Sequence, residues 1–209
     1  MDSISYFTHL FSKGGLVMYP LVIFSIAAIA IAFERYSYYR ANWHANDGLV
    51  DKIHSALDEQ NWGSAVEVCN HFDTVISRTI KAGLILAASD NVKTLEIKDA
   101  FEERMAVEIT GLRRHLDYLS AMVTLSPLLG LLGTVTGMIA AFGAIDEGAA
   151  AMAISGGVGE ALVATATGLC VAATAFLIYT FFNHQFDKVI ADAENICSFV
   201  LEHRRGERA

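Results

Sequence analysis

An acidic side chain that shares a helical face with hydroxyl groups is the feature of this sequence best suited to chemistry. From Leu119 to Phe182 the only Asp, Glu, Lys or Arg residues are Asp146, Glu147 and Glu160. Asp146 and Glu147 lie together in a Gly/Ala-rich connection, whereas Glu160 lies inside an apolar stretch. An ionisable group in such a stretch is costly to place and usually faces a partner or a water-filled path. Glu160 is therefore a candidate for holding a proton.

Threonines follow Glu160 at helical spacing. At about 100° per residue, Thr167 lies about 20° and Thr174 about 40° from Glu160 around the helix, whereas Thr165 lies about 140° away. Hydroxyl groups both donate and accept hydrogen bonds, so hydroxyls and water can relay a proton along a narrow polar seam. Two simpler interpretations stay open. A threonine hydroxyl can bond back to its own helix, and Glu160 can be an acid near a helix N-terminus that reaches the outer surface.

Three apolar stretches are long enough to cross a membrane, whose core of about 30 Å needs about 20 helical residues. They are 14–36, 119–145 and 157–183, in a chain that is 54% apolar. Residues 146–156 are expected to connect the second and third. A cleaved signal peptide is disfavoured for the first, because Glu34, Arg35 and Arg40 follow the apolar run and Lys13 alone precedes it.

The cationic residues predict the orientation. Of 15 Lys and Arg, ten lie between Arg35 and Arg114, four follow the third stretch, and one precedes the first. The positive-inside rule then places the N-terminus outside, and residues 37–118 and 184–209 inside. In a bacterium this describes a multi-pass inner-membrane protein with a periplasmic N-terminus. Residues 1–13 are expected to form a short amphipathic segment at the outer surface.

Helical periodicity continues beyond the second and third stretches. Apolar residues recur every three or four positions from Thr94 to Leu119 and run into the second stretch with no breaker. The same period continues after Phe182 to about Glu202. The predicted fold is therefore an all-α membrane protein with three transmembrane helices, the second and third extended into a cytoplasmic helical bundle.

Small residues repeat along both long spans. Gly130, Gly133 and Gly137 line one side of the second, and Gly168 lies in a similar series on the third. Such residues let helix backbones approach closely. Helices this rich in small residues rarely face lipid on every side, which favours an oligomer.

Other classes of function find little support. The sequence has no nucleophile motif, phosphate-binding glycine loop, metal-ligand spacing or internal repeat, so we expect neither an enzyme nor a bound cofactor or metal. The net charge of -8, without a basic patch, argues against nucleic acid as a partner.

Two motifs resemble those of the MotA/TolQ/ExbB proton-channel family, most closely its ExbB and TolQ branches. They are Gly130-Leu-Leu-Gly-Thr-Val-Thr-Gly137 and Gly159-Glu-Ala-Leu-Val-Ala-Thr-Ala-Thr-Gly-Leu169. The resemblance implies a homopentameric ring whose second and third spans line a pore. In that pore would sit two helices of an ExbD- or TolR-like single-span partner with a membrane aspartate.

The resemblance also implies roles for particular residues. The pore threonines of the family fall on Thr134 and Thr165, with Thr165 near the boundary with the second span and opposite Thr134, and the pore glutamate falls on Glu160. Thr167 stands where an apolar residue is common and Ala173-Thr174 where a proline is frequent, so Thr167 and Thr174 are open as extensions of the path.

The implied function is a proton-channel or stator subunit of an ExbB–ExbD-type motor. Such a motor would use the proton motive force to energise a TonB-like protein for outer-membrane transport. The alternatives are a TolQ-like subunit of a Tol–Pal envelope system and a membrane assembly scaffold that conducts no protons. The flagellar MotA branch is disfavoured because it carries a further span.

Overall fold

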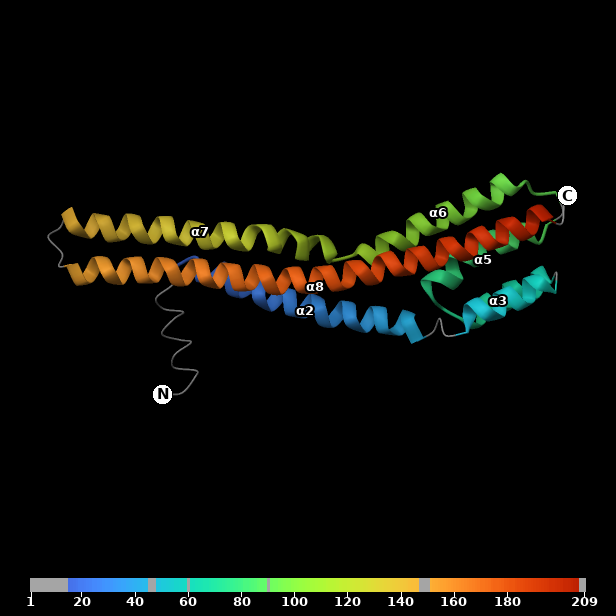
Figure 1. The fold of residues 1–209 in the computed structure, drawn as a ribbon, viewed down its shortest axis with the longest axis horizontal. Coiled ribbons are helices and arrows are strands. Elements are labelled where there is room, and N and C mark those ends of the chain that lie inside the picture. Colours follow the sequence, from blue (N-terminus) through green and yellow to red (C-terminus); the bar gives the residue numbers. More distant parts are fainter. Residues whose placement is uncertain (1–14, 45–47, 60, 90, 147–150, 207–209) are drawn as a thin grey trace. The chain divides into compact units, whose positions relative to one another are not determined.

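The computed structural model describes residues 15–44, 48–59, 61–89, 91–146 and 151–206. Every helix or strand element in these ranges is an α-helix (Figure 1). They are α2 (Met18–His44), α3 (Leu49–Asp58), α4 (Trp62–His71), α5 (Val75–Ala87), α6 (Thr94–Arg113), α7 (Leu116–Asp146) and α8 (Ala151–Gly206). The predicted amphipathic segment 1–13 lies outside the described residues.

The chain divides into two compact units, which are described one at a time. The first comprises Met1–Phe33 and His115–Phe181, and the second comprises Glu34–Arg114 and Phe182–Ala209. We call them the span unit and the bundle unit. The chain passes between them after Phe33, after Arg114 and after Phe181.

In the span unit, α7 and the first part of α8 run side by side in opposite directions (Figure 1). The α8 side chains that are buried here are mostly small: Ala161, Ala164, Ala172 and Ala175. Small side chains allow close approach of two helices where lipid gives no hydrophobic drive for association. Pro127 lies inside α7. Because proline has no N–H, the Val123 carbonyl lacks its usual hydrogen-bond donor four residues later.

The bundle unit has a conventional apolar core. Successive helices α3, α4, α5 and α6 pack against one another. The fully buried side chains of this core come from α3, α4, α5, α6 and the last part of α8, and include Leu49, Ile53, Leu57, Ala65, Ile76, Ile80, Leu84, Ile97, Ala193 and Val200. Burial of such side chains contributes about 1.5–3 kcal/mol each, so this core is sufficient to hold the short helices together.

Local capping explains where the short helices begin. The Asn61 side chain accepts a hydrogen bond from the Ser64 amide over 2.9 Å at the start of α4. Thr74 and Ser77 form a reciprocal capping box at the start of α5. Each cap satisfies amide donors that would otherwise be unpaired.

The prediction of a continuous helix from Thr94 into the second span is wrong. α6 ends at Arg113 and α7 begins at Leu116, and between them His115 has a left-handed backbone with φ 67°. No glycine or proline marks this break, and the apolar period continues across it. The carbonyls of Gly111 and Leu112, which have no partner within α6, are instead satisfied by Arg35 and Tyr39 of α2, which periodicity cannot reveal.

The third predicted helix is longer than expected. α8 begins at Ala151, so residues 151–156 are helical rather than part of the connection 146–156. It then continues to Gly206, in agreement with the period that extends past Phe182.

Candidate functional site

Thr165 links the two motif-bearing helices of the span unit. Its side-chain oxygen donates a hydrogen bond to the main-chain carbonyl of Gly130 over 2.9 Å. A Cβ atom at Gly130 would lie 3.0 Å from the Thr165 Cα and 3.1 Å from the Ala164 carbonyl oxygen. The glycine thus allows the backbone approach that this bond requires.

The other motif glycines lie along the same contact. A Cβ at Gly133 would meet the Ala164 Cβ at 2.5 Å, and one at Gly137 would meet the Ala161 Cβ at 2.9 Å. At Gly168 it would lie 2.5 Å from the Ser126 carbonyl oxygen. Real Cβ atoms do not come this close, so each position requires a residue without a side chain.

These glycine contacts are made within one chain. The small-residue faces of α7 and α8 are used to pack the two helices on each other, and so they are not by themselves an argument for contacts between subunits. An oligomer must be argued from other surfaces.

The remaining candidate threonines bond back to their own helices. Thr134 donates to the Leu131 carbonyl over 2.6 Å, and Thr167 and Thr174 donate to Val163 and Cys170, each over 2.9 Å. Among the candidate threonines in the described part of the chain, Thr165 is therefore the one whose hydroxyl bonds to another helix. Its two lone pairs, like those of Thr134, stay available as acceptors.

Glu160 lies on α8 in the turn before Thr165. Its side chain lies outside the described part of the structure, so the predicted seam of Glu160, Thr167 and Thr174 is not tested. Thr165 contacts α7, as its position about 140° from Glu160 allows. Thr134 lies one helical turn beyond Gly130 on α7.

Ser126 is a polar residue of this contact whose role the sequence does not indicate. It is completely buried, and within the described residues its hydroxyl has no hydrogen-bond partner. Its carbonyl packs on Gly168, beside the Thr165–Gly130 bond. In the sequence, the position of Ser126 immediately before Pro127, a proline inside a helix, could have identified it as a candidate.

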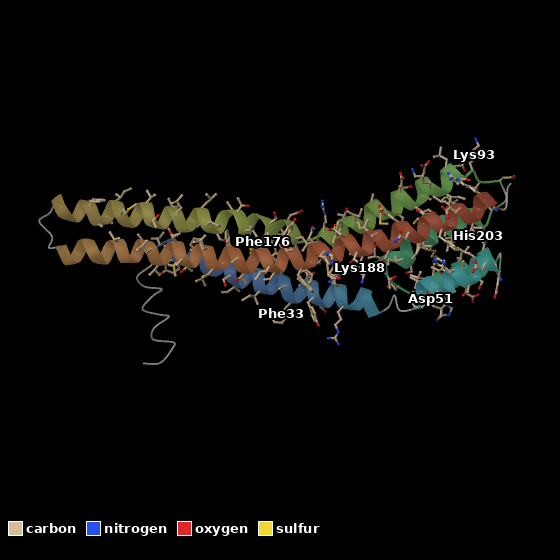
Figure 2. All side chains as sticks on the ribbon, in the orientation of Figure 1. Phe33, Asp51, Lys93, Phe176, Lys188 and His203 are labelled. Carbon is tan, nitrogen blue, oxygen red and sulfur yellow. The ribbon has the colours of Figure 1, made fainter. Side chains whose placement is uncertain are left out.

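The outer faces of the spans are apolar. Three described helices are long and apolar enough to cross a membrane, at Met18–Arg40, Leu116–Gly143 and within Gly156–Gly206. Phe33 and Phe176, both labelled in Figure 2, are 72% and 52% exposed. Apolar side chains exposed on this scale mark surfaces that meet lipid or other proteins. In the same described ranges no cluster of three or more His, Cys, Asp or Glu side chains is arranged to hold a metal ion.

Residues 71–195 match the MotA/TolQ/ExbB proton channel family. The chain belongs to that family. The match includes both motifs and every candidate site residue. Membership and the three apolar helices together identify a multi-pass membrane protein of a proton-channel family, which is not a family of enzymes.

Individual relatives agree with this family. The ExbB-like 1 biopolymer transport protein of Synechocystis sp. is 35% identical over 182 residues, which cover 81% of this chain and 67% of that protein. The ExbB-like 3 protein of the same organism is 30% identical over 173 residues, 81% of each chain. The Tol-Pal system protein TolQ of Pseudomonas aeruginosa is 26% identical over 185 residues, 84% of this chain and 80% of TolQ.

Proposed function

We propose that this family member is the proton-conducting subunit of an ExbB–ExbD-type motor in a bacterial inner membrane. In this motor a ring of five copies surrounds a single-span, ExbD- or TolR-like partner with a membrane aspartate. Proton flow then energises a TonB-like protein that acts on the outer membrane. The observation that carries the proposal is the Thr165–Gly130 bond, which joins the two family motifs at a hydroxyl.

The hydrogen bonds determine which role the two threonine hydroxyls can take toward a partner, donor or acceptor. Thr165 and Thr134 already donate to carbonyls, so each offers its lone pairs as acceptors. A protonated carboxyl group is a donor and fits such an acceptor. The proposed path therefore passes a proton on a partner's aspartate along Thr134 and Thr165, with Glu160 as the acid of this chain. Thr167 and Thr174 are secondary candidates because their hydroxyls lie further along α8.

The energy available suits mechanical work. One elementary charge that crosses 100 mV releases about 2.3 kcal/mol, so a few protons are enough to move packed helices. A gated path of hydroxyls is required, because an open water pore would dissipate the gradient.

The ring is supported by the exposed apolar surface of the span unit rather than by its glycines. Large apolar residues exposed on α7 include Leu128, Leu131, Val135, Ile139 and Phe142. In the proposed ring they contact lipid and neighbouring copies. The proposed orientation places residues 37–118 and 184–209 in the cytoplasm and the connection between α7 and α8 in the periplasm, and the Lys and Arg distribution supports it.

The experiment that tests the proposal measures proton uptake by vesicles that contain this chain with its co-expressed single-span partner. A pH-sensitive dye reports uptake driven by an imposed potential. Glu160→Gln and Thr134→Val should each reduce uptake while co-purification with the partner persists. Thr124→Val is the control, because Thr124 lies on the same helix as Thr134 but outside both motifs, and its hydroxyl bonds back to Ser120 at 3.4 Å. Full uptake by the Glu160→Gln, Thr134→Val double variant would favour the scaffold alternative.

The TolQ-like role is the second candidate, favoured by the match to TolQ over 84% of this chain. The two roles differ in the protein that the motor energises. Isolation of the complex with a TonB-like protein supports the transport role, and isolation with Tol–Pal components supports the envelope role.

A further inference from the structure

Arg35 is a buried cation at the end of α6. Its side chain is 2% exposed, and its Nη1 donates to the carbonyls of Gly111 over 3.1 Å and Leu112 over 3.4 Å. These are among the last four carbonyls of the helix, which have no partner inside it. A cation there also interacts favourably with the helix dipole.

The burial of Arg35 is compensated locally. Its Nε donates to Glu34 Oε2 over 2.6 Å, and its guanidinium lies 4.8 Å from the ring centroid of Tyr38. Burial of an unpaired charge would be strongly unfavourable, so these contacts are required for Arg35 to occupy this place. Arginine suits the position because its planar fork serves several acceptors at once, which the single ammonium of lysine does not do in the same geometry.

Tyr39 reinforces the same helix end. It lies one turn after Arg35 on α2, and its hydroxyl donates to the Leu112 carbonyl over 3.2 Å. The Tyr39 ring is 5% exposed and lies 5.6 Å from the ring of Phe182 on α8. The Arg113 guanidinium lies 5.1 Å from the ring of Phe186, one turn further along α8. Three helices are thus tied together by polar and aromatic contacts.

All of these residues belong to the bundle unit and lie close to the places where the chain leaves it. We call them the junction: Arg35, Tyr39, Leu112, Arg113, Phe182 and Phe186. The passages to the span unit come before Glu34, after Arg114 and before Phe182. Every covalent route from the proton-path helices to the bundle unit therefore ends within a few residues of the junction.

We infer that Arg35 is a positioning residue that couples proton flow to work. It fixes the end of α6 to α2 and, with Tyr39, to α8, so that a displacement arriving at any one passage is shared by all three helices. This inference rests on the proposed function, because it assigns to the junction the transmission of what the proton path drives. Without the bonds of Arg35 and Tyr39 to the end of α6, the proton path still conducts, but less of its movement reaches the bundle unit.

The test uses the full chain with its co-expressed partner and compares Arg35→Lys and Tyr39→Phe with Arg40→Lys, a matched control at an exposed position of the same helix. Three quantities are measured: proton uptake by vesicles, gradient-driven work in cells, and hydrogen exchange of the amides of residues 113–116. Loss of charge-assisted bonds at the α6 end should raise exchange there about tenfold in Arg35→Lys. Tyr39→Phe removes one neutral bond, keeps the ring on Phe182, and should act in the same direction with a smaller change.

In Arg35→Lys, proton uptake should stay within about twofold of the unmodified protein, whereas gradient-driven work should fall about tenfold, as a change of about 1.4 kcal/mol gives. Unchanged exchange in both variants, or uptake and work that fall in equal proportion, would overturn the coupling inference. Absence of proton uptake by the unmodified complex would instead overturn the proposed function. Arg40→Lys should leave all three quantities unchanged, and a change as large as that of Arg35→Lys would also contradict a specific role for Arg35.

Discussion

The hydroxyl of Thr165 on α8 lies 2.9 Å from the carbonyl oxygen of Gly130 on α7, and this bond joins the two sequence motifs of the family. Because Gly130 has no side chain, the backbones of α7 and α8 can come close, and the Thr165 hydroxyl can then reach the Gly130 carbonyl. One contact therefore serves both the packing of the helix pair and the placement of a hydroxyl at the proposed path.

The first prediction separates these two roles. Thr165→Val keeps the branched shape but removes the donor, so the helix pair should lose only about 1 kcal/mol of stability. Gradient-driven work should nevertheless fall strongly, because valine has no lone pair to accept a hydrogen bond from the partner's protonated carboxyl group. Thermal unfolding in detergent and the activity assay measure the two effects.

Thr165→Ser is the matched control for that prediction. Serine retains the hydroxyl and should keep most of the activity. Equal activities of the valine and serine variants would show that the hydroxyl does not take part in the proposed path.

The second prediction concerns Gly168, whose nearest neighbour is a main-chain carbonyl of α7. Gly168→Ala places a methyl group 2.5 Å from the Ser126 carbonyl oxygen, so the backbones of α7 and α8 must separate. Overpacking of this kind costs about 1–3 kcal/mol. Gly156→Ala, on the same helix with nothing within 4 Å of its added Cβ, should be neutral or slightly stabilising. Unfolding in detergent compares the two, and equal midpoints would contradict the observed closeness.

The third prediction concerns a buried carboxylate in the bundle unit. Glu108 accepts from the Arg78 Nε over 3.0 Å and Nη2 over 2.9 Å, and it also pairs with Arg104. The hydrogen bond from Arg78 to Glu108 raises the pKa of Arg78 further above its ordinary value, which is the direction expected when a carboxylate stabilises the guanidinium. Glu108→Gln removes the charge and one acceptor oxygen and should destabilise the bundle unit by about 1–3 kcal/mol.

Glu102→Gln is the control on the same helix. Glu102 pairs with Lys98 at 3.1 Å, but both side chains are more than half exposed. Exposed pairs contribute about 0–1 kcal/mol, so this variant should unfold close to the unmodified protein. A larger effect at Glu102 than at Glu108 would refute the assignment of the buried network.

The fourth prediction is a pH dependence. Burial raises the pKa of the Cys69 thiol from 9.0 to about 11. Between these values the folded state holds a proton that the unfolded state has lost, so stability should fall as the pH rises from about 9 to about 11. Cys69→Ala should make this fall less steep. Urea unfolding at several alkaline pH values provides the slopes, and parallel curves for the variant and the unmodified protein would disprove the effect.

Several features were determined by the sequence itself. Long apolar runs require helices that satisfy their own backbone groups in lipid, so the positions of the three spans follow from composition and length. The glycine spacing is equally local, and it indicated helix faces that allow close approach, but not that α7 and α8 of one chain use them on each other. Helical periodicity likewise predicted that α8 continues past Phe182, and α8 runs on to Gly206.

Only the tertiary structure decided how the polar groups are paired. The helix break at His115 has no glycine or proline, and it depends on Arg35 and Tyr39, which lie more than 70 residues earlier and cap the end of α6. The choice of Gly130 as the acceptor for Thr165, rather than a carbonyl of its own helix, depends on how closely α7 approaches. Periodicity records which face of a helix is apolar, but a hydrogen bond between distant segments depends on distances of a few tenths of an ångström. Those distances arise only when the helices pack.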